Sequence, residues 1–242
     1  MLWLEDFSNR LYVVFIEEDR WRRYLLTGLG RTLLVTFGSL IIGVIIGLAV
    51  AIIRSTHDTQ ADEMRPGFAK LLLRFGDRLC RIYLTIIRGT PVVVQLLIAY
   101  FVIFYSSNNK LIVAIITFGA NSGAYVAEII RSGIMSVDKG QFEAGRSLGF
   151  NHMQTMWYII SPQAFKTILP TLANEFIVLL KETSVAGYIG LEDLTKGGDI
   201  IRGRTYEAFL PLIVVAAVYL ILVIFFTWLV GKLERRLRSS DR

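Results

Sequence analysis

Long uncharged, apolar stretches alternate with short charged stretches along the chain. Two of them, residues 32–53 and 208–230, exceed the roughly 18 apolar residues that indicate a helix crossing a membrane. Further stretches keep the same character although polar residues interrupt them. The pattern predicts five membrane-spanning helices, at residues 27–53, 82–105, 111–130, 159–183 and 206–230. We therefore expect an all-α membrane protein with a single domain over residues 24–238.

The segments outside these spans differ in chemistry. We predict a basic loop at residues 54–81, a polar hairpin at 138–158 and a Gly-rich loop at 184–205. Residues 1–23 mix aromatic and charged side chains, which favours a helix lying in the membrane interface. Residues 239–242 end a basic tail.

Small residues and proline modify two of the spans. Gly43 and Gly47 have the four-residue spacing that lets a second helix approach closely. Pro91, in the run Arg88-Gly89-Thr90-Pro91, lacks a backbone N–H and predicts a break in the second span. Such a break leaves backbone groups available to a ligand.

The composition agrees with a bilayer environment. Hydrophobic residues make up 54% of the chain and charged residues 19%, against about 25% charged in soluble domains. The only cysteine, Cys80, excludes a disulfide within the chain, and His57 and His152 are too far apart in sequence to suggest a metal site.

The net charge of +6 has a simpler explanation than nucleic-acid binding, because basic residues gather in cytoplasmic loops of membrane proteins. With five spans, the loop at 54–81, the hairpin and the carboxyl-terminal tail share one side, and this side carries more lysine and arginine. We therefore expect the amino terminus outside and the carboxyl terminus in the cytoplasm.

The hairpin at 138–158 carries helix start and stop signals. Asp138 is a good helix cap with Gln141 at capping-box spacing, and Asn151 with Gln154 repeats that spacing. Gly149 stands between the two, where a helix ends. The pattern predicts a short helix, a tight glycine turn and a second helix that leads into the fourth span.

A near match to a phosphate-binding loop lies in the same segment. Gly140-xxxx-Gly145-Arg146-Ser147 has arginine where the motif needs lysine, and no strand precedes it. We therefore expect no nucleotide or other cofactor on this chain. If ATP energises the protein, another chain binds it.

The hairpin also resembles a known family signature. Glu143-Ala144-Gly145, Gly149, Ile159 and Pro162 follow the Glu-Ala-Ala-xxx-Gly-(nine residues)-Ile-x-Leu-Pro pattern of ABC importer permeases. Gly145 replaces the second alanine and Ser161 the leucine. The polar amino acid subfamily is matched by further runs in family order: Gly28…Thr32-xxx-Thr36, Arg88-Gly89-Thr90-Pro91, Ala124-Tyr125-Val126-Ala127-Glu128, Pro162-Gln163-Ala164-Phe165 and Lys181-Glu182-Thr183-Ser184.

The resemblance implies a type I importer permease in a bacterial cytoplasmic (inner) membrane, working by alternating access on a polar or charged amino acid. The implied partners are a second permease subunit (identical or paralogous), a cytosolic ATPase dimer that holds ATP and Mg, and an external amino-acid-binding protein. The chain itself would not be an enzyme. The residues implied to couple it to the ATPase are Gln141, Glu143, Ala144, Gly145, Arg146 and Gly149.

Polar side chains inside the predicted spans are candidates for the substrate pathway, because they are costly in lipid and usually face a cavity or a partner. They are Arg88, Thr90, Gln95, Asn121, Tyr125, Glu128, Asn174 and Glu175. Arg88 suits a substrate carboxylate, or it extends toward the membrane surface. Glu128 requires a partner, for which Arg131 has the right helical spacing. The signs of these charges exclude neither an acidic nor a basic amino acid.

Two other function classes compete with this interpretation. A secondary transporter driven by ions often has inverted repeats, and none is visible. A structural or channel subunit provides no reason for a capped cytosolic hairpin. Co-purification of an ATPase separates these alternatives from an ABC permease.

Overall fold

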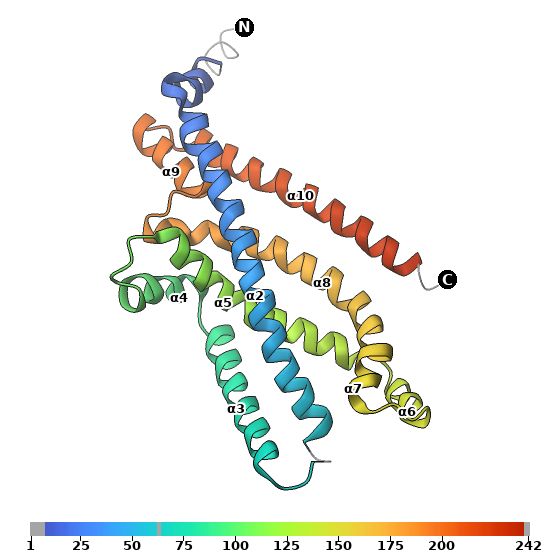
Figure 1. The fold of residues 1–242 in the computed structure, drawn as a ribbon. Coiled ribbons are helices and arrows are strands. Elements are labelled where there is room, and N and C mark those ends of the chain that lie inside the picture. The colour runs from blue at the N-terminus through green and yellow to red at the C-terminus, as the bar shows by residue number, and fades with distance from the viewer. Residues whose placement is uncertain (1–7, 62–63, 240–242) are drawn as a thin grey trace. The chain divides into compact units, whose positions relative to one another are not determined.

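The computed structural model describes residues 8–61 and 64–239, and all of the regular secondary structure in this part is helical (Figure 1). No strand occurs in that part, so the all-α prediction is confirmed. The α-helices are α2 (Thr27–Gln60), α3 (Phe68–Gly89), α4 (Val92–Ile98), α5 (Lys110–Met135), α6 (Lys139–Ser147), α7 (His152–Thr155), α8 (Ser161–Glu182), α9 (Leu194–Thr205) and α10 (Phe209–Ser239). Short π-helical or 3₁₀ turns are η1 (Tyr12–Ile16), η2 (Glu17–Asp19), η3 (Trp21–Leu26), η4 (Ala99–Ile103), η5 (Met156–Ile160) and η6 (Thr183–Ile189).

Three helical stretches of the described chain are long and apolar enough to cross a membrane: Trp21–Gln60, Lys110–Met135 and Phe209–Leu237. The broken pair formed by α3 and the helix after it makes a fourth candidate. The remaining predicted span corresponds to α8, which carries several charged side chains and is less apolar. The helix count is therefore compatible with five spans.

Two compact units divide the chain. The first comprises the residues up to Ser39, Val92–Phe118 and Ile177–Thr227. The second comprises Leu40–Pro91, Gly119–Phe176 and the residues from Trp228 onward. The prediction of one domain over 24–238 stays a prediction. Residues 1–7 of the predicted interfacial segment and 240–242 of the tail lie outside the described residues.

The first unit corrects the prediction of a loop at 184–205, because this segment contains η6 and α9. Asp193 begins α9 by accepting the N–H groups of Thr195 and Lys196. Leu194 is fully buried, and its N–H donates to the Thr32 hydroxyl at 3.1 Å. The core of this unit is formed by Val14, Phe15, Tyr24, Leu25, Leu194, Ile201, Leu210 and Val215. A Gly-rich composition suggested a loop, but a cap and a buried face were enough for a helix.

The second unit contains the close helix pair that the small residues predict. A side chain on Gly43 would meet Ser122 at 3.1 Å, and one on Gly47 would meet Val126 at 2.5 Å. Both contacts join α2 to α5. The predicted close approach is confirmed, since any residue larger than glycine at position 47 would push the helices apart.

The prediction of a basic loop at 54–81 is wrong for most of its length. α2 continues to Gln60, and α3 begins at Phe68. Lys70, Arg74 and Arg78 recur every four residues along α3, which places them on one face of a helix. Large apolar side chains stay exposed on the same helix, at Phe68, Leu71, Leu72, Phe75, Leu79, Ile82 and Ile86. The charges belong to an amphipathic helix and not to a loop.

The predicted break in the second span is confirmed. α3 ends at Gly89, Thr90 is extended (φ −124°, ψ 146°), and the next helix begins after Pro91. At the other end of the chain, α10 remains helical to Ser239, so most of the basic tail that we expected after the last span, which ends at residue 230, continues this helix.

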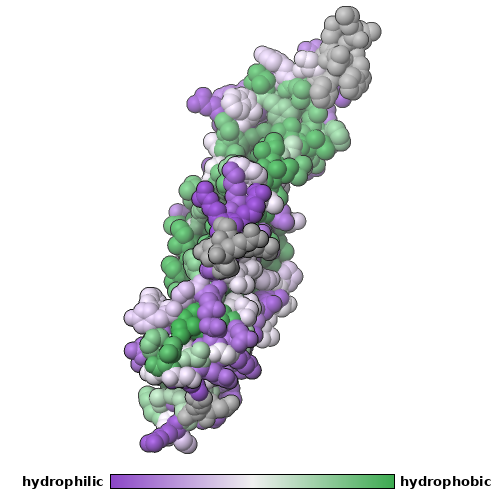
Figure 2. Space-filling model, turned by 90° about the vertical axis from the view of Figure 1, so that its right-hand side faces the viewer, coloured by the Kyte–Doolittle hydropathy of each residue, from purple (hydrophilic) through white to green (hydrophobic). Residues whose placement is uncertain are grey.

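Apolar side chains stay exposed along α10, as expected for a helix surrounded by lipid or by a partner subunit. They include Leu220, Ile221, Ile224, Phe225 and Trp228. Figure 2 shows such apolar surface lying beside strongly hydrophilic patches on one face of the molecule.

Candidate functional site

The hairpin after α5 has the two capped helices that the sequence predicts, and both are visible in Figure 1 as α6 and α7. Asp138 begins α6, and its Oδ1 accepts the N–H of Gly140 at 2.7 Å. The Gln141 side chain takes a different partner from the expected one, since its Oε1 accepts from Nε2 of Gln163 at 3.2 Å. This bond ties α6 to α8.

The turn between the two helices needs glycine. Gly149 has φ +81°, a left-handed conformation in which other residues are strained. Its N–H donates to the Arg146 carbonyl at 2.9 Å, and the N–H of Phe150 donates to the Gly145 carbonyl at 3.0 Å, a pattern that closes a helix end. The capping box between Asn151 and Gln154 follows, with both bonds at 2.9 Å. The hairpin is therefore a built two-helix element.

Gly145 explains the departure from the Glu-Ala-Ala pattern. It is buried, and a Cβ at this position would lie 2.6 Å from Cγ2 of Thr155 on α7. Gly145 therefore lets the two helices of the hairpin pack together. Glu143, Ala144 and Arg146 are exposed on the outside of α6.

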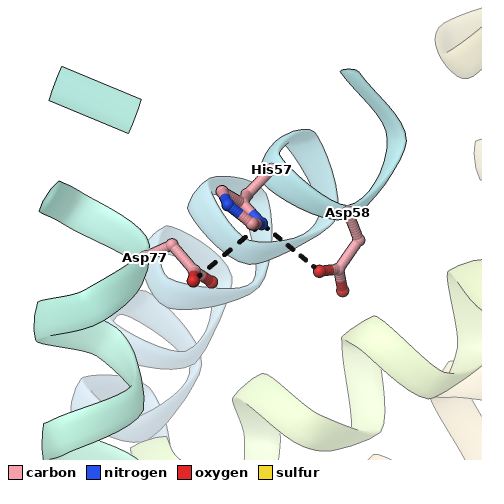
Figure 3. Close-up of side chains that lie close together, drawn as sticks. All are labelled: His57, Asp58 and Asp77. Atoms are coloured by element: carbon pink, nitrogen blue, oxygen red, sulfur yellow. Dashed lines mark ion pairs between the residues drawn. The ribbon is translucent and has the colours of Figure 1, made fainter. Parts of the chain in front are cut away.

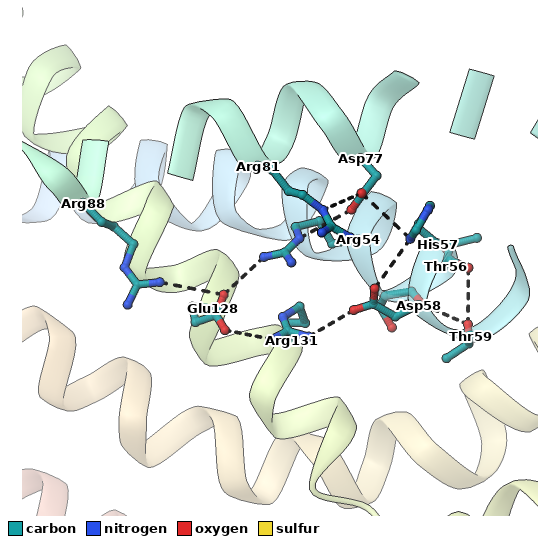
Figure 4. A network of polar contacts seen from close by, with 11 residues as sticks. Arg54, Thr56, His57, Asp58, Thr59, Asp77, Arg81, Arg88, Glu128 and Arg131 are labelled. Atoms are coloured by element: carbon teal, nitrogen blue, oxygen red, sulfur yellow. Dashed lines mark hydrogen bonds and ion pairs between the residues drawn. The ribbon is translucent and has the colours of Figure 1, made fainter. Parts of the chain in front are cut away.

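A polar cavity of about 650 Å³ lies elsewhere in the same compact unit, within the size range of small-molecule sites. Its lining comes from α2, α3 and α5, and Figure 4 shows the charged side chains of that lining. The lining residues are Arg54, Arg81, Leu84, Thr85, Arg88, Gly89, Tyr125, Glu128 and Arg131.

Glu128 is the carboxylate in this lining, and it lies among three arginines (Figure 4). Arg131 donates to its Oε1 at 3.0 Å, so the predicted partner is confirmed. Arg54 approaches its Oε2 to 3.5 Å and Arg88 to 4.0 Å. The Arg88 guanidinium also lies 5.7 Å from the centre of the Tyr125 ring, within the range of a cation–π contact.

Two aspartates extend this network on the far side of the arginines. Asp77 is buried and binds Arg81 at 2.7 Å and Arg54 at 3.6 Å. Asp58 binds Arg131 at 3.0 Å. The result is a chain of ion pairs that joins the carboxyl-terminal part of α2 to α3 and α5.

His57, Asp58 and Asp77 bring three potential metal-ligand atoms within 4.8 Å of one another (Figure 3). His57 Nδ1 lies 3.6 Å from Asp58 and 3.9 Å from Asp77. Both carboxylates already bind arginines, and these arginines would repel a cation at the same place. The group is better described as part of the ion-pair network than as a metal centre.

The structure brings only some of the predicted pathway residues together. Arg88, Tyr125 and Glu128 line the cavity. Thr90 is not in the lining but comes directly after Gly89, which is in it. Asn121 and Glu175 are buried, and Glu175 accepts a hydrogen bond from the Ser122 hydroxyl at 3.0 Å. Asn174 is exposed on α8, and Gln95 belongs to α4 of the other compact unit. Their roles stay predictions.

Sequence analysis missed Arg54, Arg81, Asp58 and Asp77, because it assigned all four to a loop. Asp77 and Arg81 stand four residues apart, which is the spacing of an ion pair on a helix. That spacing could have indicated a helix with an ion pair on its surface at this place in the sequence.

Comparisons with known proteins identify the family of this chain. The family described as "Binding-protein-dependent transport system inner membrane component" matches residues 66–239. The chain belongs to this family. Its members are inner-membrane transport components, so the chain is a membrane-spanning permease subunit and not an enzyme, as predicted.

Individual relatives agree with the family. The chain is 39% identical over 210 residues to a putative glutamine transport system permease protein from Rickettsia bellii, covering 86% of this chain and 91% of the relative. It is 35% identical over 221 residues to the arginine transport system permease protein ArtQ of Bacillus subtilis, covering 90% and 94%. The resemblance to permease subunits of amino acid ABC importers is confirmed.

A solved structure titled "Crystal structure of an amino acid ABC transporter with histidines" has the same fold. It superposes with a TM-score of 0.80 at 39% identity, covering 92% of this chain and 98% of that one. An inward-facing MetNI methionine ABC transporter shares the fold at 21% identity and a TM-score of 0.75. The predicted type I importer permease fold is thereby confirmed.

Proposed function

We propose that this permease subunit moves a polar amino acid into the cytoplasm by alternating access, driven by a separate ATPase that docks on the hairpin at 138–158. ATP and Mg would bind the ATPase dimer. A second permease subunit and an external amino-acid-binding protein would complete the importer. The amino terminus would lie outside and the carboxyl terminus in the cytoplasm.

The observation that carries this proposal is the construction of the hairpin. Its two caps, its left-handed Gly149 and the buried contact of Gly145 with Thr155 make it a rigid element. Its outer face keeps Glu143 and Arg146 exposed, and Leu148 is 73% exposed. A rigid projection with an exposed mixed surface suits docking to another protein, where aromatic or aliphatic anchors and charges share the contact.

The cavity supports amino acid transport independently of the hairpin. An amino acid carries both a carboxylate and an ammonium group, and the cavity lining offers arginines together with Glu128. Arginine binds carboxylates through two parallel hydrogen bonds. The relatives named for glutamine and arginine support the same substrate class.

The alternative of an ion-driven secondary transporter has no support from the family, which depends on a binding protein. The alternative of a structural or channel subunit does not account for the charged cavity.

The test begins with purification of the permease together with its genomic neighbours in mild detergent. We expect a stoichiometric ATPase, and ATP-dependent uptake of an amino acid after reconstitution with the binding protein. Glu143→Ala and Gly149→Leu should abolish uptake while the permease still inserts into the membrane. Lys139→Ala, an exposed change at the start of the same helix, is the matched control and should transport normally. Normal uptake by both hairpin variants would exclude the proposed docking site.

A further inference from the structure

The charges around the polar cavity do not balance. Four arginines line it, Arg54, Arg81, Arg88 and Arg131, against the single carboxylate of Glu128. Asp58 and Asp77 lie behind the arginines and neutralise part of this charge from outside the lining. Four guanidinium groups therefore face three carboxylates.

The three carboxylates already form ion pairs with the arginines. Asp77 is held by Arg81 at 2.7 Å, and Asp58 by Arg131 at 3.0 Å. Glu128 is shared by three arginines, of which Arg131 is nearest at 3.0 Å. An incoming cation would have to displace one of these arginines, whereas an incoming carboxylate would add to their pairs.

Arg88 is the arginine held least firmly by the network. Its side chain is 44% exposed, and its ion pair with Glu128 is the longest of the group at 4.0 Å. Arg54, in contrast, is 14% exposed and lies between Asp77 and Glu128. Arg88 stands beside Gly89, where α3 ends, and is therefore the group best placed to take a carboxylate.

We propose that this cavity admits amino acids whose side chains are neutral or acidic and excludes those with cationic side chains. The proposal rests on the transport function proposed above and narrows its substrate class. Arg88 would leave Glu128 to pair with a substrate carboxylate, and the ammonium group of the substrate would take the place of Arg88 beside Glu128. A cationic side chain would add a second positive charge among the remaining arginines with no carboxylate left for it.

The names of the relatives do not decide this question. One is named for glutamine and one for arginine, at 39% and 35% identity. The charge of the cavity favours glutamine-like or glutamate-like substrates.

The test measures binding to the permease itself. The permease and its ATPase are purified as a complex in lipid nanodiscs without the binding protein, so that the binding protein cannot set the specificity. Radiolabelled L-glutamine and L-glutamate are titrated, and L-arginine and L-lysine compete. We expect the cationic amino acids to bind roughly fivefold more weakly, the upper size of one exposed charge interaction.

Arg88→Gln tests the cause. It should weaken binding of every amino acid through the lost carboxylate contact. It should also reduce the ratio of the affinity for L-glutamine to the affinity for L-arginine. Arg81→Gln, at a more exposed position of the same lining, is a second variant that should narrow that ratio without the general loss. Arg78→Gln, exposed on the same helix and outside the lining, is the matched control and should leave both the affinities and the ratio unchanged.

The outcomes separate the two proposals. Binding of L-arginine as tight as that of L-glutamine would overturn the proposed selectivity and leave amino acid transport standing. ATP-driven uptake of no amino acid in the complete, reconstituted importer would overturn both. If the ratio of L-glutamine to L-arginine affinity is the same in Arg88→Gln and Arg81→Gln as in wild type, the charge of the cavity does not set the selectivity.

Discussion

The buried cap of α9 allows a stability prediction with a defined dependence on pH. Asp193 is 1% exposed, and its carboxylate accepts the N–H of Lys196 at 3.0 Å and of Thr195 at 3.3 Å. Burial raises the pKa of Asp193 from its ordinary 3.8 to about 6, although hydrogen bonds, that from the Lys196 N–H first among them, act in the opposite direction. The folded protein therefore holds this proton more tightly than the unfolded chain does.

The sign of the effect follows from linkage. A carboxyl group with a raised pKa stabilises the fold in its protonated form, so its contribution is greatest below about pH 4 and is lost as pH rises to about 6. The shift corresponds to about 3 kcal/mol. Asp193→Asn resembles the protonated form and retains a cap, since asparagine and aspartate are equally good at this position.

The assay compares thermal unfolding of wild type and Asp193→Asn between pH 4 and pH 8. We expect equal stability near pH 4, and a variant more stable by about 3 kcal/mol at pH 7, roughly 6–12 °C in melting temperature. Asp199→Asn is the control on the same helix. Hydrogen bonds from Lys196 and Arg202 hold the pKa of Asp199 below its ordinary value. This substitution should therefore lower the stability of the protein at neutral pH, and the difference from wild type should disappear at acidic pH. An Asp193→Asn variant that is no more stable than wild type at pH 7 would refute the reasoning.

Three substitutions test the packing of the second unit, each by thermal unfolding of the purified protein. Gly47→Val places new atoms against Val126, which a Cβ would already approach to 2.5 Å, and should cost about 1–3 kcal/mol or more; an unchanged melting temperature would contradict the close helix contact. Gly145→Ala should destabilise the hairpin by a similar amount. Adding Thr155→Ala removes the two nearest of the three contacting atoms, leaves Cδ1 of Ile159 at 3.2 Å, and should restore most of the lost stability. Failure of the second change to rescue the first would place the strain elsewhere. Asn151→Ala should cost about 1 kcal/mol by removing the capping box, and a neutral result would show that the cap is redundant.

The elements that the sequence predicted well are those with short-range signals. Asn151 and Gln154 satisfy each other within four residues, so their capping box could be read without knowledge of the rest of the fold. Gly149 and Pro91 act in the same way, because a left-handed turn and a missing N–H are properties of single residues.

The elements that the sequence predicted poorly depend on distant partners. The segment at 184–205 was assigned as a loop because of its glycines, yet Leu194 is buried and bonded to Thr32, more than a hundred residues earlier. The segment at 54–81 was assigned as a loop because of its charges. Arg54 of α2 meets Asp77 of α3 only when the two helices come together, and a single sequence does not reveal that pairing.

The candidate site shows the same division. Arg131 was identified as the partner of Glu128 because three residues separate them on one helix. The contacts of Glu128 with Arg54 and Arg88 cross between helices, so the sequence left the sign of the substrate charge open. Only the assembled cavity shows that arginines outnumber carboxylates in its lining.

The hairpin and the cavity lie within one compact unit and are connected through α5. α5 supplies Tyr125, Glu128 and Arg131 to the cavity, and the hairpin begins directly after this helix. On its other side the hairpin is tied to α8 through Gln141 and Gln163. We infer that a force applied to the hairpin would act on α5 across the short link at residues 136–138, and that moving α5 would change the distances of Glu128 to Arg54 and Arg88. Because both of these contacts are already long, at 3.5 and 4.0 Å, a small displacement is enough to alter which arginine is available to a carboxylate.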